Sequence, residues 1–258
     1  MKKLCALFLF LFLFNSFAEA QVVDSTNFVT DRPGVATPPD IVTLQSFQIE
    51  NGFQYEKYSD GTILNENILF SSLLLRYGLF EIAEVRVQTD YAYTLQRDSS
   101  ISSRIIGFNP VTIGTKIKLV EQRTIIPNVS LLLNLALPFI GEDEFRPEHA
   151  APSCYLLLSN DLSDKLNLCS NYGLIWDGSS SIPSHFYALC IGMDVSNNVS
   201  IFLEGYGLLN HFLKPEHYAD TGFGYLIANN LQVDFSIAGS LSLYSGYYLL
   251  NMGVVWEL

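Results

Sequence analysis

The stretch that decides the fold class is the last one in the chain, Tyr248-Leu249-Leu250-Asn251-Met252-Gly253-Val254-Val255-Trp256-Glu257-Leu258. Its alternate positions are apolar and would share one face of a β-strand: Tyr248, Leu250, Met252, Val254, Trp256 and Leu258. The other face carries Asn251, Gly253, Val255 and Glu257. A strand with one apolar face fits either a soluble sandwich or a transmembrane barrel, so the rest of the chain must distinguish these two folds.

The same alternation recurs toward the N-terminus. It predicts twelve strands, at about residues 43–57, 67–77, 82–94, 107–120, 127–138, 152–160, 165–176, 185–195, 198–209, 217–227, 230–241 and 246–258. Residues 21–42 contain Pro33, Pro38 and Pro39, which exclude a helix and disfavour a central strand. We therefore expect an extended N-terminal lead at 21–42 and a single all-β domain at 43–258.

The connections between these strands alternate in length. Short polar turns are expected at 78–81, 121–124, 162–165, 196–198 and 228–230, and longer polar loops at 95–106, 139–151, 177–184 and 210–216. Outer-membrane barrels sort their connections in this way, with the short turns in the periplasm. The sequence therefore predicts a single antiparallel transmembrane β-barrel of about twelve strands.

The N-terminus indicates export. Lys2 and Lys3 precede an apolar run from Leu4 to Phe14, and small residues flank Glu19 as in a signal-peptide cleavage site. We expect residues 1–20 to be a cleaved signal peptide. The mature barrel would then lie in the outer membrane of a Gram-negative-type bacterium, with the lipid bilayer and the barrel-insertion machinery as its partners.

Removal of residues 1–20 takes away two lysines and one glutamate, leaving 12 basic and 25 acidic residues and a net formal charge of −13. Such a charge disfavours nucleic acid as a partner, because phosphates would be repelled. The chain is nevertheless apolar on average, with a mean hydropathy of +0.24. This combination is compatible with a membrane protein.

Charged residues on the polar faces of the predicted strands would face the lumen. These candidates are Glu50, Glu84, Arg86, Asp90, Lys116, Lys118, Glu204, Asp220 and Asp234. A hairpin centred near residue 101 would place Glu84 opposite Lys118 and Arg86 opposite Lys116. The lead could fold into the lumen, where Arg32 would meet acidic wall residues. Two roles remain open for these charges: holding the wall together, or selecting solutes.

Nothing in the sequence predicts an enzyme, a cofactor or a metal site. The four histidines fall in loops or at strand ends, without a convincing catalytic partner. After cleavage three cysteines remain, Cys154, Cys169 and Cys190, each inside a predicted strand and without the spacing of a zinc site or a disulfide framework. We interpret them as small side chains that fill the wall or the lumen.

Several short motifs resemble a family of outer-membrane proteins named for the meta-pathway of phenol degradation. They are Thr30-Asp31-Arg32-Pro33-Gly34, Phe47-Gln48-Ile49-Glu50-Asn51-Gly52, Leu75-Arg76-Tyr77-Gly78-Leu79, Ala83-Glu84-Val85-Arg86-Val87, Ile113-Gly114-Thr115-Lys116, Leu137-Pro138, Leu203-Glu204-Gly205-Tyr206-Gly207, Asp220-Thr221-Gly222-Phe223-Gly224-Tyr225 and Asp234. The resemblance spans most of the mature chain. It implies an outer-membrane barrel that passes small solutes, of an aromatic or apolar kind. The alternative is a closed barrel with a structural or surface-interaction role.

Overall fold

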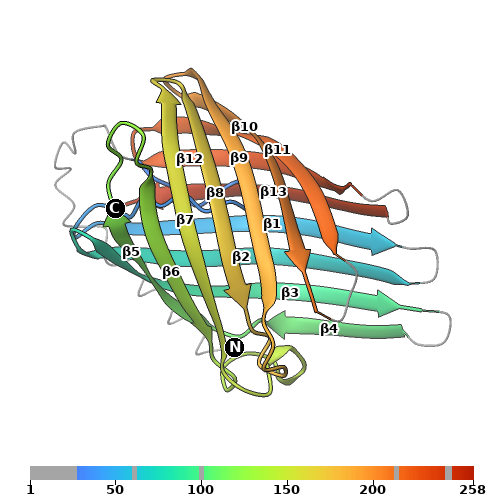
Figure 1. Cartoon of the computed structure of the whole chain (residues 1–258). Coiled ribbons are helices and arrows are strands. Elements are labelled where there is room, and N and C mark those ends of the chain that lie inside the picture. The colour runs from blue at the N-terminus through green and yellow to red at the C-terminus, as the bar shows by residue number, and fades with distance from the viewer. Residues whose placement is uncertain (1–27, 60–62, 99–101, 212–214, 242–245) are drawn as a thin grey trace, which may run out of the picture.

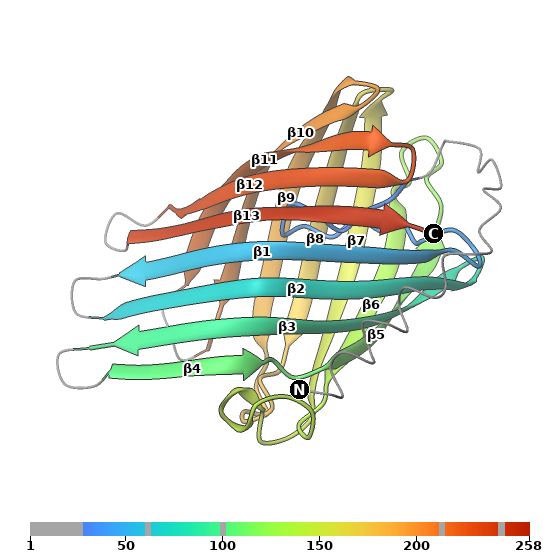
Figure 2. The same cartoon turned by 180° about the vertical axis from the view of Figure 1, so that it is seen from behind.

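The computed structural model describes residues 28–59, 63–98, 102–211, 215–241 and 246–258. The predicted signal peptide, 1–20, and residues 21–27 of the lead lie outside this part. Figures 1 and 2 show one closed antiparallel sheet. Its strands are β1 (Phe47–Ser59), β2 (Leu64–Phe80), β3 (Ala83–Arg97), β4 (Ser102–Phe108), β5 (Thr112–Val120), β6 (Asn128–Ala136), β7 (Ala151–Ser163), β8 (Leu166–Ile175), β9 (Ser184–Ser196), β10 (Val199–Leu209), β11 (Glu216–Ala228), β12 (Leu231–Ser240) and β13 (Gly246–Glu257).

These strands make a twelve-stranded barrel, which confirms the predicted fold. β4 and β5 pair one after the other with β3, so they are two halves of one barrel strand. Pro110, which has no backbone N–H to donate, lies in the break between them. β1 pairs with both β2 and β13, and this closes the ring. Closure gives backbone N–H and C=O groups partners without an open sheet edge, as lipid requires.

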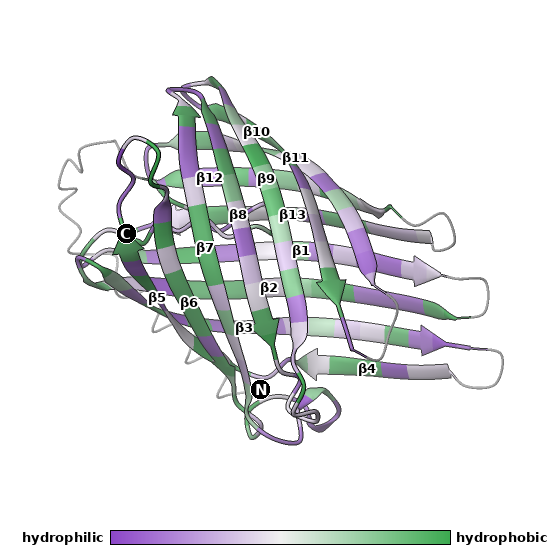
Figure 3. Cartoon of the chain, viewed as in Figure 1, coloured by the Kyte–Doolittle hydropathy of each residue, from purple (hydrophilic) through white to green (hydrophobic). Residues whose placement is uncertain are grey.

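The two faces of the wall have inverted polarity. Leu203 is 59% exposed, whereas the next residue, Glu204, is only 2% exposed. Large apolar side chains of the same outer face are exposed all round the barrel, while charged and amide side chains are buried inside it. Figure 3 shows this alternation as bands of opposite hydropathy along the strands. A wall that is apolar outside and polar inside is suited to a barrel surrounded by lipid with a polar lumen.

Most connections alternate in length as predicted, but the long loop expected at 95–106 was wrong, because β3 continues to Arg97 and β4 begins at Ser102. Turns at 81–82, 164–165, 197–198 and 229–230 are tight, and a longer turn at 121–127 lies at the same end of the barrel. The opposite end carries the loops 137–150 and 176–183, the first of which contains the short 3-10 helix η1 (Asp143–Phe145), and the connection between β10 and β11. Within the described ranges, no helix has the length and apolar character needed to cross a bilayer.

Two further details of the prediction were wrong. The first strand begins at Phe47 and not at residue 43, because the chain turns at Gln45, whose φ is 66°, and crosses closely over Gly78. A Cβ atom on Gly78 would overlap the carbonyl of Thr43, so only glycine permits this crossing.

The register between the third and fourth predicted strands was also wrong. Glu84 lies opposite Lys116, and Arg86 lies opposite Gly114. The pair Arg97 and Ser102 centres the hairpin before residue 101, and the break at 109–111 moves the register by only one residue back toward the expected pairing. The real register makes Glu84 and Lys116 an attractive pair.

A charge on the outer face should test the orientation of the wall. We expect Leu203→Arg, near the middle of β10, to lower the free energy of unfolding in bilayers by about 2–4 kcal/mol, because arginine would face hydrocarbon. Ile125→Arg is the matched control, since Ile125 lies in the 121–127 turn and is 88% exposed. Urea titration in lipid vesicles measures both, and equal effects would contradict the assigned faces.

Candidate functional site in the lumen

Residues 28–43, here called the plug segment, lie inside the barrel. Side chains on β1, β2, β3, β5, β6, β8, β10, β12 and β13 all contact this segment, so the wall surrounds it. In Figures 1 and 2 the blue coil that precedes β1 runs within the ring of strands. Val42 is only 2% exposed, which shows how deeply the segment is enclosed.

Asp31 of the plug segment is the centre of a buried charge network. Its carboxylate lies 3.4 Å from Arg76 Nη1, 2.5 Å from Arg86 Nη1 and 2.8 Å from Lys116 Nζ. Burial alone would raise the pKa of this carboxyl group, but the three positive charges outweigh burial and hold its pKa well below the usual range. Asp31 is therefore charged at any physiological pH.

The wall supplies the rest of the network. Arg76 Nη1 donates to Glu50 Oε1 at 2.8 Å, and Arg76 Nη2 donates to Glu84 Oε2 at 2.8 Å. Within this network the wall contributes three cations and two carboxylates, and Asp31 supplies the third negative charge that balances them. An unpaired buried cation is costly, whereas charge-assisted hydrogen bonds offset its desolvation. The wall is electrostatically complete only with the plug segment in place.

Arg32 makes a second attachment, on the opposite side of the plug segment. Its guanidinium donates to Asp234 Oδ1 at 2.9 Å and to Asn251 Oδ1 at 2.8 Å. The group lies flat against Gly52 and Gly253, which are register partners on β1 and β13. A Cβ atom on either glycine would overlap the guanidinium group. The absence of side chains at these two glycines leaves the space that the Arg32 guanidinium occupies.

Wall side chains also satisfy the backbone of the plug segment. The Glu204 carboxylate accepts hydrogen bonds from the N–H groups of Val35 and Ala36 at 3.0–3.2 Å. Asn171 both accepts from the N–H of Thr37 at 2.7 Å and donates to its carbonyl at 2.8 Å. Lys116 Nζ donates to two further plug carbonyls at 2.9 Å. Wall side chains thereby supply hydrogen-bond partners that a segment with no secondary structure of its own would otherwise lack.

Aromatic rings lie beyond the plug segment, toward the long loops. Tyr206 stacks on Tyr218 at 5.1 Å, and Tyr218 contacts Tyr247 at 4.4 Å between ring centroids. The buried cluster they join includes Ala36 of the plug segment, with Phe186 packed against it. The lumen is thus filled in two layers, by the plug segment and by this aromatic cluster.

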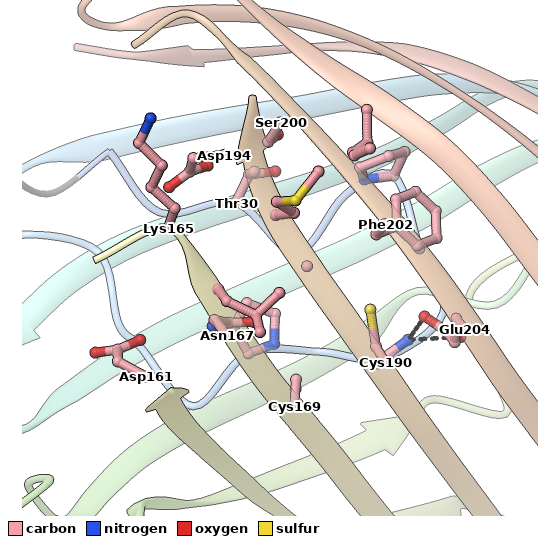
Figure 4. Close-up of a pocket in the computed structure, with 18 of the residues that line it drawn as sticks. Thr30, Asp161, Lys165, Asn167, Cys169, Cys190, Asp194, Ser200, Phe202 and Glu204 are labelled. Atoms are coloured by element: carbon pink, nitrogen blue, oxygen red, sulfur yellow. Dashed lines mark hydrogen bonds between the residues drawn. The ribbon is translucent and has the colours of Figure 1, made fainter. Parts of the chain in front are cut away.

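A cavity of about 640 Å³ remains between the plug segment and strands β7–β10. Figure 4 shows it with Glu204, Cys169 and Cys190 at one end and Asp161, Lys165 and Asp194 at the other. A second cavity, of about 880 Å³, lies beside the turns at 197–198 and 229–230. The plug segment therefore fills the β1–β6 side of the lumen by its charge network and leaves space on the other side.

The structure places the charges predicted for the lumen in different surroundings. Arg32 contacts Asp234, and Glu204 binds the backbone of the plug segment. Four further predicted charges belong to the network around Asp31: Glu50, Glu84, Arg86 and Lys116. Asp220 is buried opposite Glu204, and neither of its carboxylate oxygens has a hydrogen-bond partner. Asp90 is half-buried beside Asn109, away from the network. Lys118 pairs with Glu121 at the turn end and contacts none of these groups.

Sequence reasoning missed the two residues at the centre, Asp31 and Arg76. Both fall within the motifs that carried the family resemblance, and this was the only signal for them in the sequence. Arg76 follows the leucines at 73–75, and this apolar run conceals which residues of β2 face inward. Among the described residues, no group of three or more His, Cys, Asp or Glu side chains is placed to hold a metal ion.

The substitution Asp31→Asn tests how much the charge balance contributes to the free energy of unfolding. We expect the free energy of unfolding to fall by about 3–5 kcal/mol, because one buried cation loses its partner. Lys118→Gln, at the exposed pair with Glu121, is the control and should cost less than about 1 kcal/mol. Chemical unfolding of the refolded mature chain measures both, and a similar small change in each would contradict a network centred on Asp31.

The same network predicts a pH dependence. The folded pKa of Asp31 is depressed, so its contribution is fully present above the unfolded value of about 3.9 and is lost only as pH falls toward the folded value. Asp31 should therefore add no pH dependence between about pH 5 and 8. The difference in stability between the parent and Asp31→Asn should narrow only below about pH 4, and a difference that changes near neutrality would contradict this assignment.

Comparisons with known proteins agree with this architecture. The fold is similar to that of an outer membrane channel from Pseudomonas putida F1, with a TM-score of 0.68 and 13% identity, over 88% of this chain and 99% of that one. It is also similar to the translocator domain of the autotransporter NalP from Neisseria meningitidis (TM-score 0.55, 10% identity, 82% and 88% covered). A third similar structure is the KdgM porin in complex with disordered oligogalacturonate (0.54, 10%, 80% and 98%).

At these identities the structural likeness establishes the fold alone, which is that of outer-membrane barrels. No curated protein matches the chain. A family model does match, over residues 30–258, from the start of the Thr30-Asp31-Arg32-Pro33 motif to the last residue. The chain belongs to the family described as MetA-pathway of phenol degradation.

Proposed function

We propose that the chain is an outer-membrane channel for small solutes, held closed by its own plug segment. The observation that carries the proposal is what fills the lumen. A twelve-stranded barrel is wider than the eight-stranded barrels whose interior is just filled by wall side chains, and here a separate piece of chain occupies part of the space through noncovalent contacts. Such contacts can be released, whereas a lumen packed by its own wall cannot be opened without unfolding.

In this proposal the lumen charges have two duties. Arg32 attaches the plug segment to the wall, and the wall residues Glu50, Glu84, Arg86, Lys116, Glu204 and Asp234 hold it in place. After its release these wall residues line the open path with Asp90, Lys118 and Asp220 and set its selectivity. The aromatic cluster beyond the plug segment favours small solutes of aromatic or apolar character. The proposed role is transport, without a catalytic step.

The route to the membrane is part of the same proposal. Residues 1–20 would direct export and be removed, and the barrel-insertion machinery would place the mature chain in the outer membrane. Support for this comes from the sequence of residues 1–20, the outer-membrane type of the barrel and the shared family.

Single-channel recording in planar bilayers tests the function. We compare the refolded mature chain, residues 21–258, with the same chain lacking residues 21–42. We expect few or small conductance steps from the first and frequent, larger steps from the second, because deletion empties the lumen beside β1–β6. Heat-modifiable mobility on a gel establishes that each sample is folded. Silence from both folded proteins would contradict a channel and favour the closed structural role.

The substitution Gly253→Ala tests whether the plug segment can be released without being deleted. The added methyl group would overlap the Arg32 guanidinium, and lost hydrogen bonds to a charged group cost about 1.5–3 kcal/mol. We therefore expect the open probability to rise by about 10- to 100-fold. Gly239→Ala is the matched control, because its added Cβ would find ordinary contact at 3.8 Å. An unchanged open probability in Gly253→Ala would show that Arg32 does not hold the plug segment.

A further inference from the structure

Two cysteines face each other inside the lumen. Cys169 on β8 and Cys190 on β9 are direct register partners in the antiparallel sheet. Both line the cavity of about 640 Å³ beside the plug segment, as Figure 4 shows, and Cys169 is only 6% exposed. Their thiols are free in this structure. No part of the proposed channel function uses them.

The backbone geometry permits a bond between these two thiols. Directly opposed residues of antiparallel strands have Cα atoms about 4.5 or 5.5 Å apart, according to the type of pair. The N–H of Asp194 donates to the carbonyl of Lys165 in the same ladder, and Cys169 and Cys190 lie four residues along it, so they are a hydrogen-bonded pair with Cα atoms about 5.5 Å apart. Disulfides span Cα separations of about 4.4–6.8 Å, so this pair falls within range. The Cβ atoms of directly opposed residues lie about 4.5–5.5 Å apart, and a disulfide spans about 3.5–4.5 Å. Closing the bond therefore requires side-chain rotation together with a local approach of β8 and β9 by roughly an ångström.

We propose that Cys169 and Cys190 form a redox-active dithiol site, which a small disulfide compound entering through the cavity converts to a cross-strand disulfide. One thiolate attacks the reagent's disulfide, forms a mixed disulfide and releases one reagent thiol. The second protein thiolate then attacks the protein sulfur of this mixed disulfide, closes the Cys169–Cys190 bond and releases the second reagent thiol. Two protein thiols are oxidised, one reagent disulfide is reduced, and the two protons pass to the released thiols.

The third cysteine, Cys154, cannot join this pair, because its side chain lies on the other face of the sheet. Cys154 on β7 lies opposite Leu174, whereas the β7 residue opposite Cys169 is Ser159. Ser159 is buried on the lumen side, and Cys154, five positions earlier, has the opposite parity and shares a face with the exposed Leu156. Cys154 therefore points away from the lumen. The odd number of cysteines in the mature chain thus resolves into one pair and one separate thiol.

The bond should leave the plug segment in place. Cys169 Sγ donates weakly to the carbonyl of Thr37 at 3.5 Å, and a disulfide sulfur has no hydrogen to donate. The same carbonyl also accepts from Asn171 Nδ2 at 2.8 Å, and the Thr37 N–H keeps its bond to Asn171 Oδ1. The site is therefore a covalent modification of the wall that does not require the plug segment to leave.

Thiol counting on the folded mature chain in detergent tests the proposal. The protein is reduced, treated with oxidised glutathione, quenched with acid, denatured and labelled with a maleimide, and its intact mass is measured. We expect three labels on the reduced protein and one on the oxidised protein, with loss of two hydrogen masses and no retained glutathione. Peptide mapping should join the peptides that contain Cys169 and Cys190.

The chain offers matched variants. Cys154→Ser should take two labels when reduced and none when oxidised. Cys169→Ser and Cys190→Ser should each form no internal bond, and the remaining lumen thiol should retain glutathione instead. Heat-modifiable mobility shows that each variant is folded before treatment. Three labels on the oxidised parent, two retained glutathiones, or a mapped bond to Cys154 would each overturn the proposal.

Discussion

The rest of this structure depends on one electrostatic constraint, the neutralisation of three buried cations. Arg76, Arg86 and Lys116 point into the lumen, but their wall neighbours Glu50 and Glu84 supply only two negative charges. The third, Asp31, comes from a segment that is not part of the wall. Because a buried cation without a partner is strongly unfavourable, the plug segment and the barrel form one electrostatic unit. The same argument explains why opening such a lumen must expose these charges to water or to a solute.

The other attachments follow a common physical rule, which is that the wall supplies what an irregular segment cannot supply for itself. Prolines in the plug segment leave it without regular hydrogen bonding, and side chains such as Glu204, Asn171 and Lys116 bond its backbone instead. Gly52 and Gly253 contribute by having no side chain, which lets a planar guanidinium lie against the wall. The contacts are numerous and specific, yet all are noncovalent and therefore reversible.

The lumen is filled unevenly, and this asymmetry bears on function. The charge network around Asp31 occupies the side next to β1–β6, whereas cavities remain next to β7–β12, with carboxylates near the turns and a pair of thiols deeper inside. The aromatic cluster lies farther along, toward the long loops. A solute crossing the proposed channel would thus meet aromatic rings, then the plug segment, and then a polar chamber.

The sequence by itself determined the architecture: twelve strands, the alternation of short and long connections and the polarity of each face. These features are local, because side chains alternate along a strand and turns depend on a few adjacent residues. It also indicated most of the lumen charges, from Glu50 to Asp234. Only the tertiary structure decided which charges meet, since one residue of register changes every partner across a hairpin, as Glu84 and Lys116 show. The central position of Asp31 and Arg76, and the meeting of Cys169 with Cys190, likewise required the closed ring, because contacts between distant segments leave no periodic trace in the sequence.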